Sequence, residues 1–259
     1  MVKGLYTAYT GMINEQHRMD TLTNNLANST TVGFKKEGTT SQSFNAVLAL
    51  KVKDTSEPVN IPKRIGINHP GVKIGENYTD YSQGSFKITD NTYDLALSGD
   101  GFFEIEFTNK AGETSTKYTR DGSFALTQEG YLVTKDGNYV MGSNGRIQLD
   151  PLLDSSIDSL GVISQNGVVK DTIRVVDFAD YNYLKKYGEN LLEPVEGAQV
   201  QAADYKVFSG YLEMSNVQIV TEMVDLIAIT RQYEANQKII KSIDSTLDIA
   251  ANQLGRVQG

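Results

Sequence analysis

The sequence contains no cysteine. Disulfide bonds and thiolate metal sites are therefore excluded, although this absence assigns no cellular compartment. No apolar run approaches the roughly 18 residues that cross a membrane as a helix. The first residues, Met1 to Thr7, also lack the apolar core of a secretory signal peptide. We therefore expect neither insertion into a membrane nor a cleavable secretory leader.

Histidine and positive charge are also scarce. The two histidines, His17 and His69, have a spacing that suits no metal site. The turn at Asp100-Gly101 lacks both the oxygen ligands of an EF-hand and the rest of a dinucleotide-binding fingerprint. No serine lies in a nucleophile elbow. We therefore expect no catalytic residue, no cofactor and no metal, and the chain is not predicted to be an enzyme.

The net charge of -8 argues against nucleic acid as a partner. Its distribution is uneven. Residues 1–38 carry four Lys/Arg and three Asp/Glu, and residues 215–259 carry four and five, so both ends are nearly neutral. Residues 39–214 carry sixteen and twenty-four, which accounts for the whole excess of -8. Neutral ends can pack closely beside copies of themselves, whereas an acidic middle stays solvated.

The end of the chain has the pattern of one long helix. Apolar residues and one asparagine recur there at alternating steps of three and four, which are the a and d positions of a coiled coil. This C-terminal seam consists of Leu226, Ile229, Tyr233, Asn236, Ile240, Ile243, Leu247, Ala250 and Leu254. A second stripe consists of Val217, Val220, Val224 and Ile227. Since Ser215-x-x-Gln218 matches a capping box, we predict a helix over residues 215–254, about 60 Å long.

The start of the chain predicts a shorter amphipathic helix of roughly 24 residues, about 36 Å long. Its apolar face, with one glutamine, consists of Leu5, Tyr9, Met12, Gln16, Met19, Leu22 and Leu26. Gly4 and Gly11 each weaken it by about 1 kcal/mol relative to alanine. The polar and β-branched residues from Asn28 to Gly33 end the pattern.

The two helices differ in length, so pairing them leaves part of the C-terminal seam uncovered. We therefore expect both ends to pack against other copies, although an ordinary helical hairpin within one chain is the alternative. Polar residues at such positions specify register. We expect Asn236, Asn24 and Asn25 to do so. For Asn28 the interface role and simple helix termination are equally favoured.

The middle of the chain is predicted to be mainly antiparallel β structure. Pairs of a polar residue and glycine, the typical signal of a hairpin turn, recur through it. They are Asp100-Gly101, Asp121-Gly122, Glu129-Gly130, Asp136-Gly137, Asn144-Gly145 and Asn166-Gly167. The short apolar runs between residues 121 and 144 favour a meander of short strands.

Other segments of the middle are assigned from local composition. Residues 51–76 hold three of the five prolines and predict an extended connection or a protruding loop. Residues 44–50 fit a short helix or a strand equally well. We predict strands at 172–178 and 200–208 and a turn of helix at 181–188.

The predicted fold class is therefore α+β: a discontinuous, antiparallel, coiled-coil-like pair of terminal helices with a central β domain. We expect a helical assembly domain over 1–38 and 210–259, a connector over 39–76 and a β-rich outer domain over 77–209.

Several motifs distributed along the chain resemble one known family. They are Thr23-Asn24-Asn25-Leu26-Ala27-Asn28, Thr31-x-Gly33-Phe34-Lys35, Tyr81-Ser82-Gln83-Gly84-Ser85-Phe86, Asp94-Leu95-Ala96-Leu97-x-Gly99-x-Gly101-Phe102-Phe103, Tyr118-Thr119-Arg120-Asp121-Gly122-Ser123-Phe124 and Gly210-Tyr211-Leu212-Glu213-Met214-Ser215-Asn216-Val217. Together they resemble the axial proteins of the bacterial flagellum, specifically the rod subunits of the basal body. Residues 39–76 match no pattern that distinguishes the members of this family.

The resemblance implies a structural subunit that polymerises into a tube, with the terminal helices around a central export channel and the β domain outside. It also implies export beyond the cytoplasmic membrane by the flagellar export apparatus. The expected partners are copies of the same chain and neighbouring rod and hook subunits. The length and the C-terminal motif resemble the distal rod subunit most, with a proximal rod or hook-type paralogue as the alternative. A wall-glycan hydrolase or an adhesin with a helical stalk represents a different class.

The predicted assembly interface combines the apolar faces and asparagines of both terminal helices. Its residues are Leu5, Tyr9, Met12, Met19, Leu22, Asn24, Asn25, Leu26, Asn28, Leu226, Ile229, Tyr233, Asn236, Ile240, Ile243, Leu247 and Leu254.

Overall fold

The computed structural model describes residues 2–45, 47–51, 63–69, 71–110, 112–188 and 190–252. The chain forms two compact units, and each is discontinuous in sequence. The helical unit comprises Met1–Leu26, Glu37–Thr79 and Ile219–Gly259. The β unit comprises Ala27–Lys36 and Asp80–Gln218.

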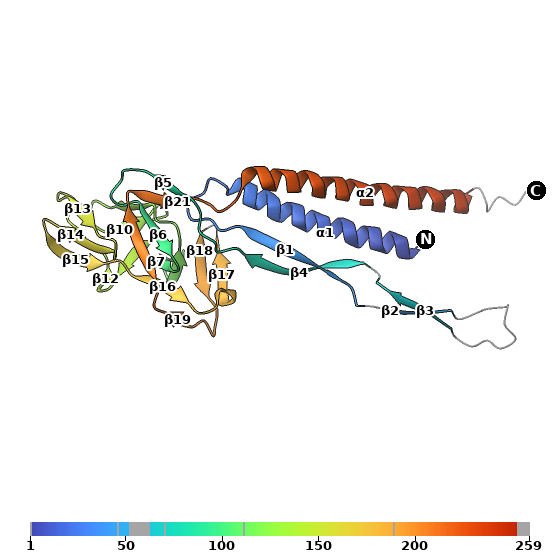
Figure 1. Cartoon of the computed structure of the whole chain (residues 1–259), viewed down its shortest axis with the longest axis horizontal. Helices are drawn as coiled ribbons and strands as arrows, with labels where there is room; N and C mark the ends of the chain where they lie inside the picture. The colour runs from blue at the N-terminus through green and yellow to red at the C-terminus, as the bar shows by residue number, and fades with distance from the viewer. Residues whose placement is uncertain are drawn as a thin grey trace, which may run out of the picture. The chain divides into compact units, whose positions relative to one another are not determined.

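The helical unit contains two long helices side by side and a two-stranded arm (Figure 1). Its elements are α1 (Val2–Ala27), β1 (Glu37–Ser43), β2 (Val47–Lys51), β3 (Lys63–Asn68), β4 (Val72–Thr79) and α2 (Ile219–Asn252). β1 pairs with β4 and β2 pairs with β3, both antiparallel. The contact between the N- and C-terminal helices and the central antiparallel sheets confirm the predicted α+β class.

The C-terminal helix begins four residues later than the capping box predicts, at Ile219 instead of Ser215. The reason lies in tertiary contacts that hold residues 215–218 in the β unit. The Asn216 side chain accepts a hydrogen bond from the Lys36 backbone N–H (2.8 Å) and donates one to the Asp80 carbonyl (2.8 Å). The Ser215 hydroxyl accepts from the Val217 N–H, only two residues ahead. These bonds favour an irregular turn over a first turn of helix.

The β unit is built almost entirely from short antiparallel strands. Its main sheet has the order β17-β18-β8-β7-β11-β10-β9, with β12, β16 and β19 attached to it. The strands of this sheet are β7 (Phe102–Thr108), β8 (Thr114–Thr119), β9 (Phe124–Leu126), β10 (Leu132–Thr134), β11 (Tyr139–Gly142), β12 (Gly145–Arg146), β16 (Val175–Phe178), β17 (Leu184–Tyr187), β18 (Leu191–Pro194) and β19 (Val200–Gln201).

Smaller sheets complete the β unit. Three strands form the sheet β13-β14-β15, and two further pairs are β20-β6 and β21-β5. Their bounds are β5 (Phe86–Ile88), β6 (Leu95–Gly99), β13 (Ser155–Ile157), β14 (Val162–Gln165), β15 (Val168–Thr172), β20 (Tyr205–Ser209) and β21 (Tyr211–Glu213). A 3-10 turn covers Tyr181–Tyr183.

The predicted meander is confirmed, because β9, β10, β11 and β12 pair in sequence order. Its turns use the glycines that marked them. Gly130 and Gly137 both have φ of 85°, where glycine is strongly favoured. Between β14 and β15, Asn166 and Gly167 both have positive φ, at 49° and 77°, as a type I′ hairpin turn requires.

Other local predictions are confirmed only in part. The 44–50 segment, which fitted helix or strand equally, contains the start of β2. Of the 181–188 segment only the first three residues are helical, and the rest enters β17. The strands expected at 172–178 and 200–208 are each interrupted, by residues 173–174 and 202–204. In the proline-containing segment, 52–62 and 70 lie outside the described residues, and β3 and β4 occupy much of the rest.

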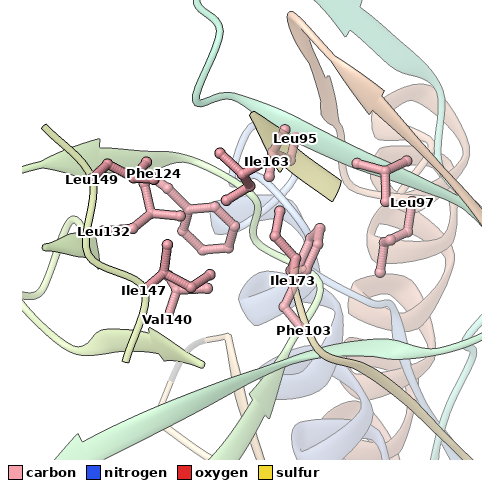
Figure 2. Packing of buried hydrophobic residues seen from close by; sticks show 11 residues of the cluster. Leu95, Leu97, Phe103, Phe124, Leu132, Val140, Ile147, Leu149, Ile163 and Ile173 are labelled. Atoms are coloured by element: carbon pink, nitrogen blue, oxygen red, sulfur yellow. The ribbon is translucent and has the colours of Figure 1, made fainter. Parts of the chain in front are cut away.

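Two clusters of buried apolar side chains form the core of the β unit. The larger cluster packs β6, β7 and the meander against β14, and Figure 2 shows its side chains converging. Its members are Leu95, Leu97, Phe103, Phe124, Leu132, Val140, Ile147, Leu149, Ile163, Ile173 and Val207. Phe103 meets Phe124 edge to face, with ring centroids 5.2 Å apart. The smaller cluster contains Phe102, Tyr118, Val176, Phe178, Leu184 and Leu192.

Candidate functional site

The two terminal helices form one antiparallel pair with a constant register (Figure 1). A Cβ placed on Gly4 would lie 3.7 Å from Ile243 Cδ1, and one on Gly11 would lie 3.0 Å from Asn236 Nδ2. Further along, the Thr230 hydroxyl lies 3.9 Å from the Met19 sulfur. In an antiparallel pair, the numbers of two facing residues have the same sum wherever the register does not shift. This sum is 247 for the two glycine contacts and 249 for the third contact, so the register stays nearly constant along the pair.

The C-terminal seam is the face of α2 that contacts α1. From Leu226 to Ile243 every seam position is buried or half-buried, and Ile229 is only 3% exposed. All other positions from 231 to 252 are exposed. The alternating three-four spacing therefore identified the buried face of this helix correctly.

The seam extends past the end of α1. α2 has 34 residues and α1 has 26. With the observed register, no residue of α1 lies opposite Leu247, whose side chain is 39% exposed. Leu254 lies outside the described residues. At 1.5 Å per residue, the eight extra residues leave about 12 Å of α2 without a partner helix in the same chain.

Gly11 has a specific role in the helix pair. Its missing side chain leaves room for the Asn236 side chain, whose Nδ2 would otherwise lie 3.0 Å from a Cβ. A contact that short is tighter than side chains normally make. The glycine that lowers helix propensity therefore lets the one polar seam residue sit against the facing backbone.

The predicted interface residues of α1 divide into two groups. Tyr9 is 51% exposed and points away from the seam. Those that are half-buried are Leu5, Met12, Met19, Leu22 and Leu26. Their contact with other copies stays a prediction, as it does for the seam residues of α2.

Asn25 is fully buried, and its bonds lie within its own chain. Its Nδ2 donates to the Glu37 carbonyl (2.8 Å) and to Glu222 Oε2 (3.3 Å), while its Oδ1 accepts from the Glu37 N–H (2.9 Å). Asn25 therefore joins the end of α1, the start of β1 and the start of α2. Its neighbour Asn24 is exposed.

Asn28 follows α1 directly and shapes the turn that ends it. Its Oδ1 accepts a hydrogen bond from the Thr31 hydroxyl (3.3 Å), and its carbonyl accepts from the Thr31 N–H (3.2 Å). These bonds suit a turn that ends a helix, and a contact of Asn28 with other copies stays a prediction.

The β unit contains a cluster of buried charges that the sequence analysis did not single out. At its centre is Glu213, whose side chain is 0% exposed. Its Oε1 accepts hydrogen bonds from Lys35 Nζ (2.6 Å) and from the Gly84 N–H (3.0 Å). Its Oε2 accepts from Arg120 Nη1 (3.3 Å). One carboxylate thus balances two buried cations.

Backbone carbonyls bind further donors of this charge cluster. Lys35 Nζ donates to the Ser82 carbonyl (2.9 Å), and Arg120 Nη2 donates to the Gly99 carbonyl (2.7 Å). The Gly33 N–H donates to the Glu213 carbonyl (2.8 Å). Burial lowers the pKa of the Lys35 ammonium, and the Glu213 carboxylate opposes this shift.

The charge cluster brings together five of the motifs that carried the family resemblance. Residues 33–35, 82–84, 97–99, 120 and 213 come from five separate segments of the chain and meet at this point. The signal that was missed is that Lys35, Arg120 and Glu213 each stand inside one of the family motifs. The cluster anchors the segment that follows α1 and the segment that precedes α2 to the β unit.

The chemistry of these sites is structural. Among the described residues, no three His, Cys, Asp or Glu side chains form a group that could hold a metal ion. No helix in the described part of the chain is long and apolar enough to cross a membrane. The charged groups at the centre of the cluster are bonded to one another and to the backbone.

The fold and these sites define a class: a structural subunit in which discontinuous terminal helices accompany a β domain. Three family models match the chain. The flagellar basal body rod protein model matches residues 5–35, the flagellar hook protein FlgE/F/G D1 domain matches 96–170, and the flagellar basal body rod FlgEFG protein C-terminal model matches 209–254.

Curated relatives match over nearly the whole length. The flagellar basal-body rod protein FlgG of Bacillus subtilis is 33% identical over 97% of this chain and 99% of its own. The flagellar basal-body rod protein FlgF of Caulobacter vibrioides is 33% identical over 99% and 100%. The hook-basal body complex protein FlhO of Bacillus subtilis is 28% identical over 99% and 100%.

The chain therefore belongs to the flagellar basal-body rod FlgE/F/G family. It is a non-enzymatic structural subunit of the flagellar basal-body rod, outside the cytoplasmic membrane, which confirms the predicted family, class and location.

Proposed function

We propose that this chain is a distal rod subunit that polymerises into a tubular drive shaft. The shaft transmits torque from motor to hook and surrounds the export channel. Its partners are copies of itself, neighbouring rod and hook subunits and the flagellar export apparatus. The FlgG and FlgF relatives, which are basal-body rod proteins and match over nearly their full length, support the assignment to the rod.

The observation that carries this proposal is the poor core of the helical unit. Among residues whose side chains the structure describes, 25 apolar residues are buried, and only Ala8 and Ile229 belong to this unit. Burial of apolar surface stabilises by about 25 cal/mol per Å², so a long helix pair that buries so little gains little from its own packing. Neighbouring copies would supply the missing contacts.

The resulting contacts suit a mechanical role. Closely packed side chains have low compressibility, so a tube of packed helices transmits a twisting load without bending. The neutral charge of both terminal segments lets helices of different copies approach closely, while the acidic residues remain in the solvated middle.

A substitution in the seam tests this proposal. Ile243→Asp places a charge where α2 contacts Gly4 of α1, so we expect polymerisation to be lost while the β unit stays folded. Electron microscopy and sedimentation measure polymer, and near-UV circular dichroism of tyrosine reports the β unit. Leu152→Asp is the control, since Leu152 is 94% exposed and belongs to the β unit. An Ile243→Asp chain that still builds rods would contradict the proposal.

A further inference from the structure

Two apolar surfaces of the helical unit are left uncovered in the single chain. The first is a ridge on α2, formed by Val220, Met223, Val224 and Ile227, which are 76%, 49%, 60% and 55% exposed. It contains the exposed members of the second stripe, to which the sequence analysis gave no role. At about 100° per residue, Val220 lies about 180° around the helix from Ile229 at the centre of the seam. α1 therefore cannot cover the α2 ridge.

The second surface is a groove of about 310 Å³ between α1 and the β1–β4 arm. Its lining is mainly apolar and includes Tyr9, Ile13, Phe44, Val72, Lys73 and Ile74. Tyr9 is 51% exposed and Phe44 is 37% exposed. This arm groove therefore presents aromatic and aliphatic side chains to any molecule that approaches it.

Contacts within the chain give the arm groove its shape. Asn14, which is 3% exposed, exchanges hydrogen bonds of 3.0 and 3.1 Å with the Ser41 hydroxyl, which fixes β1 against α1. The Phe44 N–H donates to the Gly71 carbonyl (3.0 Å) at the end of the groove. A Cβ on Gly71 would clash with the Thr10 side chain, so the arm lies directly on the helix there.

The ridge and the groove lie on opposite sides of the helix pair. On α1, Gly11 faces Asn236 of α2, and Ile13 lies about 200° further around the helix. The ridge lies on the far side of α2 from α1. A chain therefore cannot place its own ridge in its own groove.

The two surfaces are both apolar and carry charges of opposite sign. An apolar row of side chains at helical spacing is one known occupant of an apolar groove. Asp225 is exposed next to Val224 on the ridge, and Lys73 is exposed at the groove, so the charges that accompany the two surfaces have opposite sign.

We propose that the α2 ridge of one copy docks into the arm groove of the next copy, with Asp225 beside Lys73. The inference rests on the proposed function, since it names the surfaces through which copies meet. Because ridge and groove are different surfaces, the contact is heterologous. A row of docked copies therefore has a free ridge at one end and a free groove at the other. Such a contact extends into an open polymer, which an isologous dimer contact does not.

Cross-linking tests the pairing directly, because the chain has no cysteine of its own. One chain carries Val224→Cys and a second carries Phe44→Cys. We expect oxidation of the polymerised mixture to give disulfide-linked dimers of the two different chains. The matched control is Leu152→Cys mixed with Phe44→Cys, since Leu152 is 94% exposed and belongs to the β unit. We expect its yield to be at least tenfold lower.

Two results would overturn the pairing. One is a yield equal to that of the control. The other is efficient cross-linking of the Val224→Cys chain to itself, because that would place two ridges face to face.

Polymerisation of variants provides a second test. Val224→Asp should raise the critical concentration at least tenfold while leaving the circular dichroism of the monomer unchanged, and Leu152→Asp should leave both unchanged. Lys73→Glu and Asp225→Lys should each raise it about two- to fivefold, as expected for an exposed ion pair. The variant that carries both Lys73→Glu and Asp225→Lys should have a critical concentration within about twofold of that of the natural chain.

The outcomes separate the two proposals. If the natural chain polymerises and Val224→Asp polymerises equally well, the docking of ridge into groove is wrong and the rod function stands. If the natural chain forms no polymer, on its own or on isolated basal bodies, the proposed function itself is wrong and the docking fails with it.

Discussion

The β unit and the helical unit obtain their stability in different ways. The β unit contains 23 of the 25 buried apolar residues and both apolar clusters. The helical unit buries Asn14, Asn25 and Glu222 but, among its described side chains, only two apolar residues. Polar bonds fix geometry but add little net stability, whereas apolar burial supplies most of it. The β unit therefore gains far more from apolar burial than the helical unit does, and we propose that other copies complete the helical unit.

Removing the central charge of the buried cluster should give the largest effect, and it should fall on the β unit. Glu213→Gln leaves the Lys35 and Arg120 cations buried without a counter-charge, so we expect a loss of about 3–5 kcal/mol in the free energy of unfolding. Urea titration followed by tyrosine fluorescence measures it. Glu106→Gln is the control, because it breaks an ion pair with Arg146 at the surface. A loss below about 1 kcal/mol would show that the cluster does not hold the unit together.

An intermediate effect is expected at the polar centre of the helical unit. Asn25→Ala removes the hydrogen bonds of the buried Asn25 side chain to the half-buried N–H and carbonyl of Glu37, so we expect the free energy of unfolding to fall by about 1–3 kcal/mol. Hydrogen exchange of the polymer should show faster opening at the end of α1 and the start of β1, with no change in the β unit. Asn24→Ala changes the exposed neighbour and should have little effect. Equal effects of the two variants would contradict the role assigned to Asn25.

The smallest effect concerns pH and the surface of the β unit. Hydrogen bonds from Arg146 lower the pKa of Glu106 below its ordinary value of 4.5. A carboxyl with a lowered folded-state pKa contributes stability that is fully present above 4.5 and is lost as pH falls through the folded value. The natural chain should therefore exceed Glu106→Gln in urea midpoint at pH 7, and the gap should narrow on acidification to about pH 3. If the difference in urea midpoint widened toward low pH, the pKa of Glu106 in the folded state would be raised and not lowered.

Local sequence patterns predicted the elements whose stability is encoded locally. The alternating spacing from Leu226 to Ile243 identified both the helix and its buried face, and the polar-glycine pairs located the turns of the meander. The antiparallel pairing followed from two complementary apolar faces. These features repeat at short range, so one sequence is sufficient to find them.

Contacts between distant residues were not predictable in this way. Lys35, Arg120 and Glu213 meet only after folding, and no local sequence pattern indicates that these three residues are neighbours. The capping box at Ser215 was overridden for the same reason, because Asn216 bonds Lys36 and Asp80. The polar strand β1 has no alternating apolar pattern, and its pairing with β4 and its side-chain bonds to α1 hold it in place.

Hydrogen exchange of the verified monomer and of the polymer is the most direct test of the contrast between the two units. We expect residues 5–26 to exchange rapidly in the monomer and to become protected on assembly, because isolated helices of this length with two glycines are marginal in water. The β unit should be protected equally in both states. Strong protection of residues 5–26 in a verified monomer would contradict the conclusion that neighbouring copies complete the helical unit.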